Sequence, residues 1–196
     1  MQDPRTLPVL TAHAAHEAGH YTTARIGARL YPAYFAKVRF RLVTIIPDDI
    51  SGGVVDVDIC KHYTLPDPMK EPERLSEANK EPYLVHFMGG MAGQWIWMVF
   101  DAQKKIPTLE IIEPMLTNLW NMARADAGGK PDIALARKLV GKEDLKPFFI
   151  QAMHIMIDHW PALLRLTHAL MDNRWLDARA AHLAWSGSNN EPSRGS

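Results

Sequence analysis

The sequence has only one cysteine, Cys60, among its 196 residues. A single thiol excludes a disulfide within the chain and is typical of a reducing compartment. The first residues also lack the apolar core of a secretory signal peptide. We therefore expect a cytoplasmic protein.

An excess of charge of either sign is also lacking. Lysine and arginine together number 22, aspartate and glutamate together number 22, and the formal net charge is zero. This balance predicts neither a nucleic-acid-binding protein nor a polybasic membrane anchor.

Long apolar runs are scarce as well. The most apolar stretch, residues 83–100, is at the short limit for a membrane-spanning helix, and it contains His86, Gln94 and three glycines. It lacks the basic flanking residues of a stop-transfer segment. We expect a buried core helix here and no membrane span.

No phosphate-binding loop of the G-x-x-x-x-G-K-[ST] type occurs in the sequence, so we expect no ATPase activity from this chain. Its length and its 47% content of hydrophobic residues fit a single globular domain. We expect that domain to cover residues 1–185, followed by a flexible tail over residues 186–196.

The hydrophobic pattern predicts a mainly α-helical domain with a small β-sheet or hairpin. Residues 37–46 and 54–59 alternate or are rich in β-branched side chains, which is typical of strands. Residues 61–82 are rich in proline and charge and predict an irregular connection, with a short helix at 73–79. Thr11 is the expected N-cap of the first helix, after an extended lead-in. The expected helices cover residues 11–29, 82–101, 109–125, 131–140, 145–171 with a bend near Pro161, and 176–185.

The first predicted helix contains the pattern His16-Glu17-Ala18-Gly19-His20. Residues four apart lie on one face of a helix, so the two imidazoles can bind one zinc ion. Glu17 follows the first histidine and can act as general base toward the attacking water. This H-E-x-x-H pattern therefore indicates a catalytic zinc site.

Two further residues of this helix bear on the site. Glycine lowers helix propensity, so Gly19 indicates a close approach of another backbone. His13 lies on the ligand face but seven residues before His20, which is about 10 Å along the helix axis. That separation is too long for one tetrahedral ion, so we expect His13 to support the site or to lie at the surface.

A catalytic zinc ion usually has three protein ligands and a water. The residues themselves leave the third ligand open, because several carboxylates follow. Asp132 opens a predicted helix, where the helix dipole alone also favours an acidic side chain. The candidates are Glu110, Glu113, Asp101, Asp126 and Asp132.

The zinc-binding pattern and several later segments together resemble the peptidase domain of the FtsH family of ATP-dependent zinc metalloproteases. The segments follow in the family's order from residue 12 to residue 181, and the ordered set is more specific than the H-E-x-x-H pattern alone. They are His16 to His20 with Ala15 before it, Val43-Thr44-Ile45-Ile46-Pro47, Gly52-Gly53-Val54-Val55, Gly89-Gly90-Met91-Ala92, Gly128 to Asp132 with Ala136 and Leu139, and the C-terminal helices over residues 153–181.

The resemblance implies a zincin-like fold of the FtsH peptidase-domain type, and it gives Asp132 the role of third zinc ligand beside His16 and His20. It also implies that an edge strand binds extended substrate through its backbone. Cys60 follows that strand, and we interpret it as structural rather than as a zinc-binding thiol. The residues of the substrate strand are Gly53, Val54, Val55, Asp56 and Val57.

The sequence departs from the FtsH pattern in three respects. Only fifteen residues precede the zinc-binding pattern, with neither an ATPase module nor a membrane anchor among them. Gln94 replaces the glutamate that is usual in the family. The segment between Gly90 and Asp132 is longer than in the family.

Together these features predict a stand-alone zinc metalloendopeptidase that cleaves flexible or unfolded polypeptides without ATP, with Zn²⁺ as its cofactor. Two alternatives stay open: a zinc-bearing binding module without turnover, and a proteolytic subunit that receives substrate from a separate ATPase. The expected partners are a polypeptide substrate and either further copies of this chain or that ATPase, with no nucleic acid.

Overall fold

The computed structural model describes residues 7–30, 38–44, 54–59, 77–101, 104–126, 128–142 and 144–187. Over these residues the chain is mainly helical, with one small three-stranded sheet. In chain order the elements are α1 (Leu7–Leu30), β1 (Val38–Thr44), β2 (Val54–Ile59), α3 (Glu77–Phe100), α4 (Leu109–Ile112), the 3₁₀ helix η2 (Glu113–Met115), α5 (Leu116–Ala125), α6 (Lys130–Val140), α7 (Lys146–Asp158), α8 (Trp160–Asn173), β3 (Trp175–Asp177) and α9 (Ala178–Ser186).

Two predicted helix starts were wrong. α1 begins four residues before Thr11, which is therefore not its N-cap, and residues 7–10 are helical instead of extended. Pro8 explains this early start, because a proline in the first helical turn loses no hydrogen bond and has a helical φ angle. α3 likewise begins before Pro82, which lies inside the helix.

The C-terminal segment differs from the prediction in one strand. The predicted bend near Pro161 is confirmed as a break at His159, which separates α7 from α8. The last predicted helix starts later than expected, because residues 175–177 form β3 instead. Asp177 then caps α9 by accepting a hydrogen bond from the backbone N–H of Ala180 at 2.8 Å.

The other helices follow the prediction. α6 confirms the helix predicted over residues 131–140. α4, η2 and α5 together occupy residues 109–125, and Pro114 lies in the 3₁₀ turn between the two α-helices. Residues 61–76 of the predicted connection lie outside the described residues. The predicted tail also lies outside them after residue 187.

The predicted hairpin is confirmed, because β1 and β2 pair in antiparallel fashion with Thr44 opposite Val54. The register shifts between Phe40 and Leu42, where β1 has one residue more than β2, as in a β-bulge. β3 pairs antiparallel with the other side of β1, which gives the strand order β2-β1-β3. β2 is therefore an edge strand among the strands that the structure describes.

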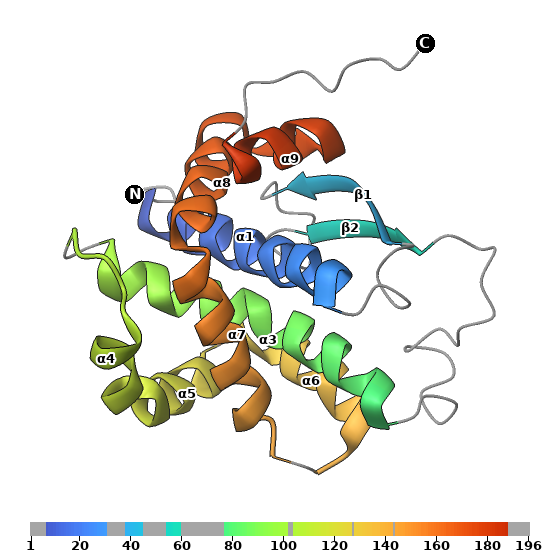
Figure 1. Ribbon diagram of the computed structural model, residues 1–196, viewed down its shortest axis with the longest axis vertical. Helices are drawn as coiled ribbons and strands as arrows, with labels where there is room; N and C mark the ends of the chain where they lie inside the picture. The colour runs from blue at the N-terminus through green and yellow to red at the C-terminus, as the bar shows by residue number, and fades with distance from the viewer. Residues whose placement is uncertain are drawn as a thin grey trace, which may run out of the picture.

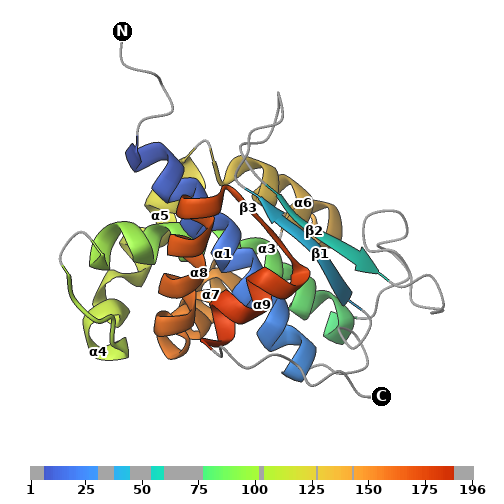
Figure 2. The same ribbon diagram turned by 90° about the horizontal axis from the view of Figure 1, so that it is seen from above.

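Helix α1 lies between the sheet and α3 (Figure 1). Seen from above, α9 lies beside β1 and the sheet (Figure 2). α3 also contacts α6 and α7, while α1 contacts α8. Helices α6, α7 and α8 thus pack against the pair formed by α1 and α3, with α6 in contact with α3.

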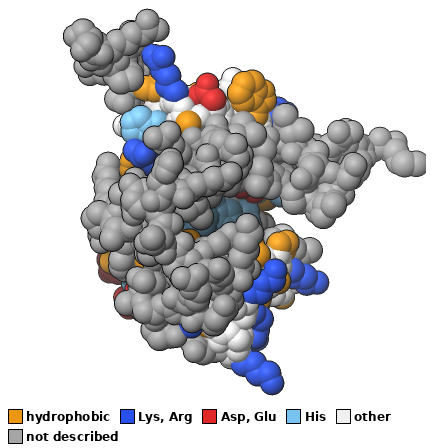
Figure 3. Space-filling model, turned by 90° about the vertical axis from the view of Figure 1, so that its right-hand side faces the viewer, with side chains coloured by type: hydrophobic (Ala, Val, Ile, Leu, Met, Phe, Trp, Pro, Cys, Tyr) orange, Lys and Arg blue, Asp and Glu red, His pale blue; other side chains and the backbone are white. Residues whose placement is uncertain are grey.

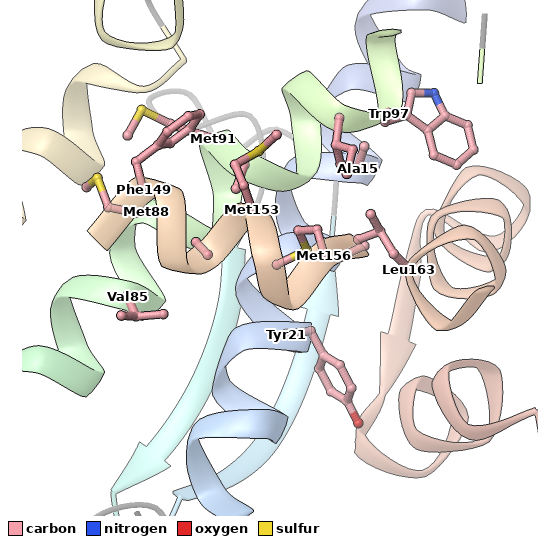
Figure 4. Packing of buried hydrophobic residues seen from close by; sticks show 14 of the residues in the cluster. Ala15, Tyr21, Val85, Met88, Met91, Trp97, Phe149, Met153, Met156 and Leu163 are labelled. Carbon is pink, nitrogen blue, oxygen red and sulfur yellow. The ribbon is translucent and has the colours of Figure 1, made fainter. Parts of the chain in front are cut away.

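The core between α3 and α7 is rich in methionine (Figure 4). Met88 and Met91 of α3 and Met153 and Met156 of α7 are at most 1% exposed, and Phe149 is fully buried with them. Methionine is flexible and polarizable, so it fills irregular gaps between helices.

The apolar stretch over residues 83–100 forms most of α3, and most of its side chains are buried, as predicted for a core helix. Across the described parts of the chain, no helix combines the length and the apolar character that a membrane span requires.

The two 24-residue helices, α1 and α3, touch backbone to backbone. A Cβ atom at Gly19 would overlap the carbonyl group of Gly89. A Cβ atom at Gly93 would lie 2.5 Å from the carbonyl oxygen of Ala15. Such contacts are shorter than packed atoms tolerate, so these positions carry no side chain unless the helices separate. The close backbone approach expected at Gly19 is confirmed.

The substitution Gly19→Ala should therefore destabilise the fold. At an exposed helical position it would add about 1 kcal/mol of stability through helix propensity. Here the new methyl group must push α3 away, and overpacking of this kind typically costs about 1–3 kcal/mol. Chemical denaturation of the metal-free protein measures the sign of the change.

The control for this measurement is Ala134→Gly, at an exposed position of α6. It should cost only the difference in helix propensity, about 1 kcal/mol. A Gly19→Ala chain as stable as the wild type would contradict the backbone contact.

Candidate metal centre

Two histidines and one aspartate meet where α1, α3 and α6 come together. His16 and His20 are one turn apart on α1, and Asp132 is in the first turn of α6. Each offers one ligand atom, and the three atoms lie within 4.8 Å of one another. The structure thus brings the histidines of the H-E-x-x-H pattern together with one of the five carboxylates that the sequence left open.

The spacing of these ligand atoms suits a tetrahedral ion. His16 Nε2 and His20 Nε2 are 3.1 Å apart. Asp132 Oδ2 is 3.1 Å from His16 Nε2, and Asp132 Oδ1 is 3.4 Å from His20 Nε2. Ligands about 2.0–2.1 Å from a zinc ion are about 3.3 Å from each other at the tetrahedral angle. The observed separations agree with that value.

One oxygen of Asp132 gives independent evidence that the group fits a cation. Asp132 Oδ2 is buried and has no hydrogen-bond partner, although His16 Nε2 is only 3.1 Å away. A buried carboxylate oxygen without a partner is costly, and a cation in front of it would remove that cost. The donor set therefore fits a divalent ion such as zinc.

Gly90 allows α3 to lie directly over the two imidazoles. A Cβ atom there would lie 2.5 Å from His16 Nε2 and would overlap His20 Nε2, so a side chain would fill the space in front of the ligand atoms. The side chains of His16 and Asp132 remain 12% and 11% exposed. Histidine atoms are visible in the face shown in Figure 3. The site is nearly enclosed but keeps access to solvent.

Hydrogen bonds fix the orientation of both imidazoles. His20 Nδ1–H donates to the carbonyl oxygen of His86 at 2.9 Å, and His86 Nδ1–H donates to the carbonyl oxygen of His20 at 3.2 Å. His16 Nδ1–H donates to Gln94 Oε1 at 3.2 Å. Because both Nδ1 atoms donate to carbonyl oxygens, each neutral ring presents the lone pair of Nε2 to the site.

The charges of the metal-free site compensate one another. Burial opposes ionisation of Asp132, but the imidazoles of His20 and His16 outweigh it and hold the pKa of the carboxyl group well below its usual range. Burial is also the largest effect on His20 and lowers its pKa, but Asp132, with a contribution from Glu17, raises the pKa to about 9. Burial, together with His20, lowers the pKa of His86 to about 3, so His86 is neutral. A carboxylate that stabilises a positive charge on His20 in this way would also stabilise a metal cation in its place.

Glu17 lies between the two histidines on α1 and is only 6% exposed. Burial raises the pKa of its carboxyl group, against the opposing effect of the imidazoles of His20 and His16. A raised pKa increases the affinity of the carboxylate for a proton, which suits a general base.

The other carboxylates considered as ligands lie elsewhere. Glu110 and Glu113 are exposed on α4 and η2. Asp101 pairs with Lys104 at 3.3 Å. Asp126 follows α5 and precedes the turn into α6. The ligating group found among the described residues contains none of these four carboxylates.

His13 is also outside the ligating group, in agreement with its distance from His20 along α1. Its side chain is partly buried, and burial is the largest effect that lowers its pKa. His16 lowers the pKa further, whereas Asp126 raises it. His13 therefore lies close enough to sense the site electrostatically without being part of it.

Three residues on one stripe of α3 complete the site, and the sequence analysis gave them no role there. His86, Gly90 and Gln94 are four residues apart, which places them on the same face of the helix. The signal was present, because a polar residue or glycine at every fourth position interrupts an otherwise apolar helix. Gln94 was noted only as a departure from the FtsH pattern.

The substrate strand expected from the resemblance coincides with β2. Residues 54–57 lie in β2, whereas Gly53 and Cys60 are outside the described residues. β2 contacts α1, the helix that carries both histidines. An edge strand therefore lies next to the helix of the candidate metal centre.

Protein purified with sufficient metal should contain about one zinc ion per chain, as measured by elemental analysis. Asp132→Ala removes a ligand and should lower zinc affinity by more than the factor of about 10–100 that is typical for residues that only support a ligand. Glu113→Ala removes an exposed carboxylate and is the control. Absence of stoichiometric zinc, or a loss of affinity in the control instead of in Asp132→Ala, would contradict this site.

Comparison of the sequence with models of known protein families and with curated proteins found no match. The argument for a function therefore depends on the geometry of this site, on its chemistry, and on the resemblance carried by short segments of the sequence.

Proposed function

We propose that this protein is a zinc metalloendopeptidase. The observation that carries the proposal is the group formed by His16, His20 and Asp132, whose ligand atoms are 3.1–3.4 Å apart. Structural zinc sites usually have four protein ligands, whereas three ligands leave a position open for water and substrate. Glu17 follows His16 in the sequence, and its buried carboxylate interacts electrostatically with His16, His20 and Asp132. Three ligands with an adjacent base favour catalysis over a purely structural metal.

Each residue around the site would have a distinct role in peptide hydrolysis. A zinc ion bound here would polarise the scissile carbonyl and make the attacking water more acidic. Glu17 would take a proton from that water and deliver it to the leaving amine. His86 and Gln94 hold the two imidazoles by their Nδ1 atoms, so that both Nε2 atoms stay directed at the site.

The resemblance to the FtsH peptidase domain supports the same function. Gly89 and Gly90, in its Gly-Gly-Met-Ala segment, lie where α3 meets the helix with the H-E-x-x-H pattern. Asp132 lies in the first turn of α6, as the resemblance implies for the third ligand. Three of the segments that carry the resemblance thus lie around one site in space. This agreement supports an FtsH-like, zincin-type architecture.

The substrate that we propose is an extended, unfolded polypeptide in the cytoplasm. β2 is at the edge of the described sheet and contacts α1, so a substrate strand can pair with the side of β2 that faces away from β1. Pairing of this kind requires a flexible segment. The 196 residues contain no ATP-binding loop that could drive the unfolding of a stable domain.

Glu17→Gln should keep zinc and the fold but lose hydrolysis. The amide has nearly the same shape as the carboxylate but cannot accept the proton. A general base contributes about 10²–10⁴-fold to the rate, and the loss of turnover should lie in that range. Peptidase assays on the zinc-loaded variant measure it. Unchanged turnover would remove Glu17 from the mechanism.

Casein, which is unstructured, should be cleaved without ATP, whereas a tightly folded domain should survive. Unfolding a stable domain typically costs about 5–15 kcal/mol, which binding to one edge strand does not supply. Gel electrophoresis of both substrates after incubation with the zinc-loaded protein shows the difference. Degradation of a stably folded protein by the isolated chain would contradict this mode of action.

Two proline variants test whether β2 binds the substrate. Successive N–H groups of a strand point to opposite sides of it. One of the two substitutions Val55→Pro and Asp56→Pro therefore removes an N–H that points toward β1. The other removes an N–H at the outer edge, where the substrate would pair. The outer-edge variant should bind zinc and keep its melting temperature but cleave casein poorly. Full activity in both variants would exclude β2 as the template.

Zinc binding without cleavage of any unfolded chain would instead favour a binding module or a subunit that depends on a separate ATPase.

A further inference from the structure

A chain of hydrogen bonds leads from the metal centre to the turn before α6. Gln94 Oε1 accepts from His16 Nδ1–H at 3.2 Å, and Gln94 Nε2 donates to Asp126 Oδ2 at 3.3 Å. The same carboxylate oxygen accepts a hydrogen bond from the backbone N–H of Gly128 at 3.1 Å. Gln94 is 9% exposed, so water has little access to its amide, whereas the hydrogen bond between Asp126 and Gly128 is exposed.

The amide of Gln94 can in principle adopt two orientations, and they have opposite consequences for His16. With the amide oxygen toward the ring, Nδ1 carries the proton and donates it, and the lone pair of Nε2 is available to a metal. With the amide nitrogen toward the ring, Nδ1 must accept, so the proton moves to Nε2 and blocks metal binding. Asp126 selects the first orientation, because a carboxylate only accepts hydrogen bonds and therefore takes the N–H of Gln94.

We propose that Gln94 and Asp126 are positioning residues of the metal centre. Asp126 fixes the orientation of the Gln94 amide, and this amide fixes the tautomer of His16 in which Nε2 binds the metal. The inference rests on the proposed metal site but not on the reaction that occurs there. It also accounts for glutamine where the FtsH resemblance leads one to expect glutamate, since a carboxylate at position 94 would face the carboxylate of Asp126.

The first test separates orientation of the amide from support of the turn. Asp126→Ser keeps a short acceptor for the Gly128 N–H but no longer reaches Gln94. Zinc affinity, measured by competition with a chromophoric chelator, should fall about 10–100-fold. Asp144→Ser is the matched control, because Asp144 also accepts from a backbone N–H two residues later, that of Lys146 at 3.0 Å, but lies before α7. Its zinc affinity should be unchanged.

A second substitution should reverse the loss. With Asp126→Ser in place, Gln94→Glu should restore most of the zinc affinity, because a carboxylate accepts from His16 in either orientation and needs no partner to orient it. Damage to the turn would not be repaired by a change at position 94. Gln94→Leu removes the acceptor altogether and should weaken zinc binding with or without the change at position 126.

The proton on His16 Nδ1 provides a spectroscopic readout that does not depend on activity. In long-range ¹H–¹⁵N spectra of the zinc-loaded wild type, this proton should be hydrogen-bonded and exchange slowly with solvent. The double variant should retain that signal. Asp126→Ser should exchange the proton faster, and Gln94→Leu should lose the hydrogen-bonded signal.

Wild-type zinc affinity in Asp126→Ser or in Gln94→Leu would overturn the inference, as would a double variant that binds no more tightly than Asp126→Ser alone. Gln94→Leu leaves the turn intact, so it decides the matter even if the variants at position 126 fail to fold. A wild type that binds zinc but cleaves no polypeptide would contradict the peptidase and not this inference. A wild type that binds no zinc would overturn both.

Discussion

Where α1 crosses α3, the two helix backbones lie against each other with no side chain between them, and the site depends on that contact. Gly19 on one helix and Gly89 and Gly93 on the other make the approach possible. The same face of α3 then presents the carbonyl group of His86 to one ligand and the amide of Gln94 to the other. A separation by the width of a methyl group would weaken both hydrogen bonds together. Packing and ligand orientation are therefore set by one interface.

The negatively charged ligand of the site comes from α6, and not from the interface of α1 with α3. Asp132 reaches the histidines from α6, and its burial would be unfavourable if the imidazoles did not compensate its charge. The compensation is incomplete, because Oδ2 has no hydrogen-bond partner. The metal-free fold therefore keeps an unfavourable polar atom at its centre, which is expected where a ligand, and not the fold alone, completes the interactions.

Local signals in the sequence predicted the parts of the fold that local interactions determine. The spacing of His16 and His20, the hairpin of β1 and β2, and α6 all follow from periodicity or from turn residues. β3 was missed because it has only three residues and forms through pairing with β1, which is distant in the sequence. The choice of Asp132 over Glu113 had the same difficulty. Both are acidic residues in or beside predicted helices, so the local pattern did not distinguish them. The FtsH resemblance implied Asp132, and the packing of α6 on α3 places it at the histidines.

The histidines and the aspartate of the candidate centre are far apart in the sequence, since Asp132 follows His20 by 112 positions. An ion held by both would close a loop of that length, much as a covalent cross-link does. In the chain-entropy description, a cross-link over about 100 residues restricts the unfolded state by the equivalent of about 4–5 kcal/mol. Metal bound at this position would thus link α1 to α6, and its loss would lower the stability of the fold as well as remove its chemistry.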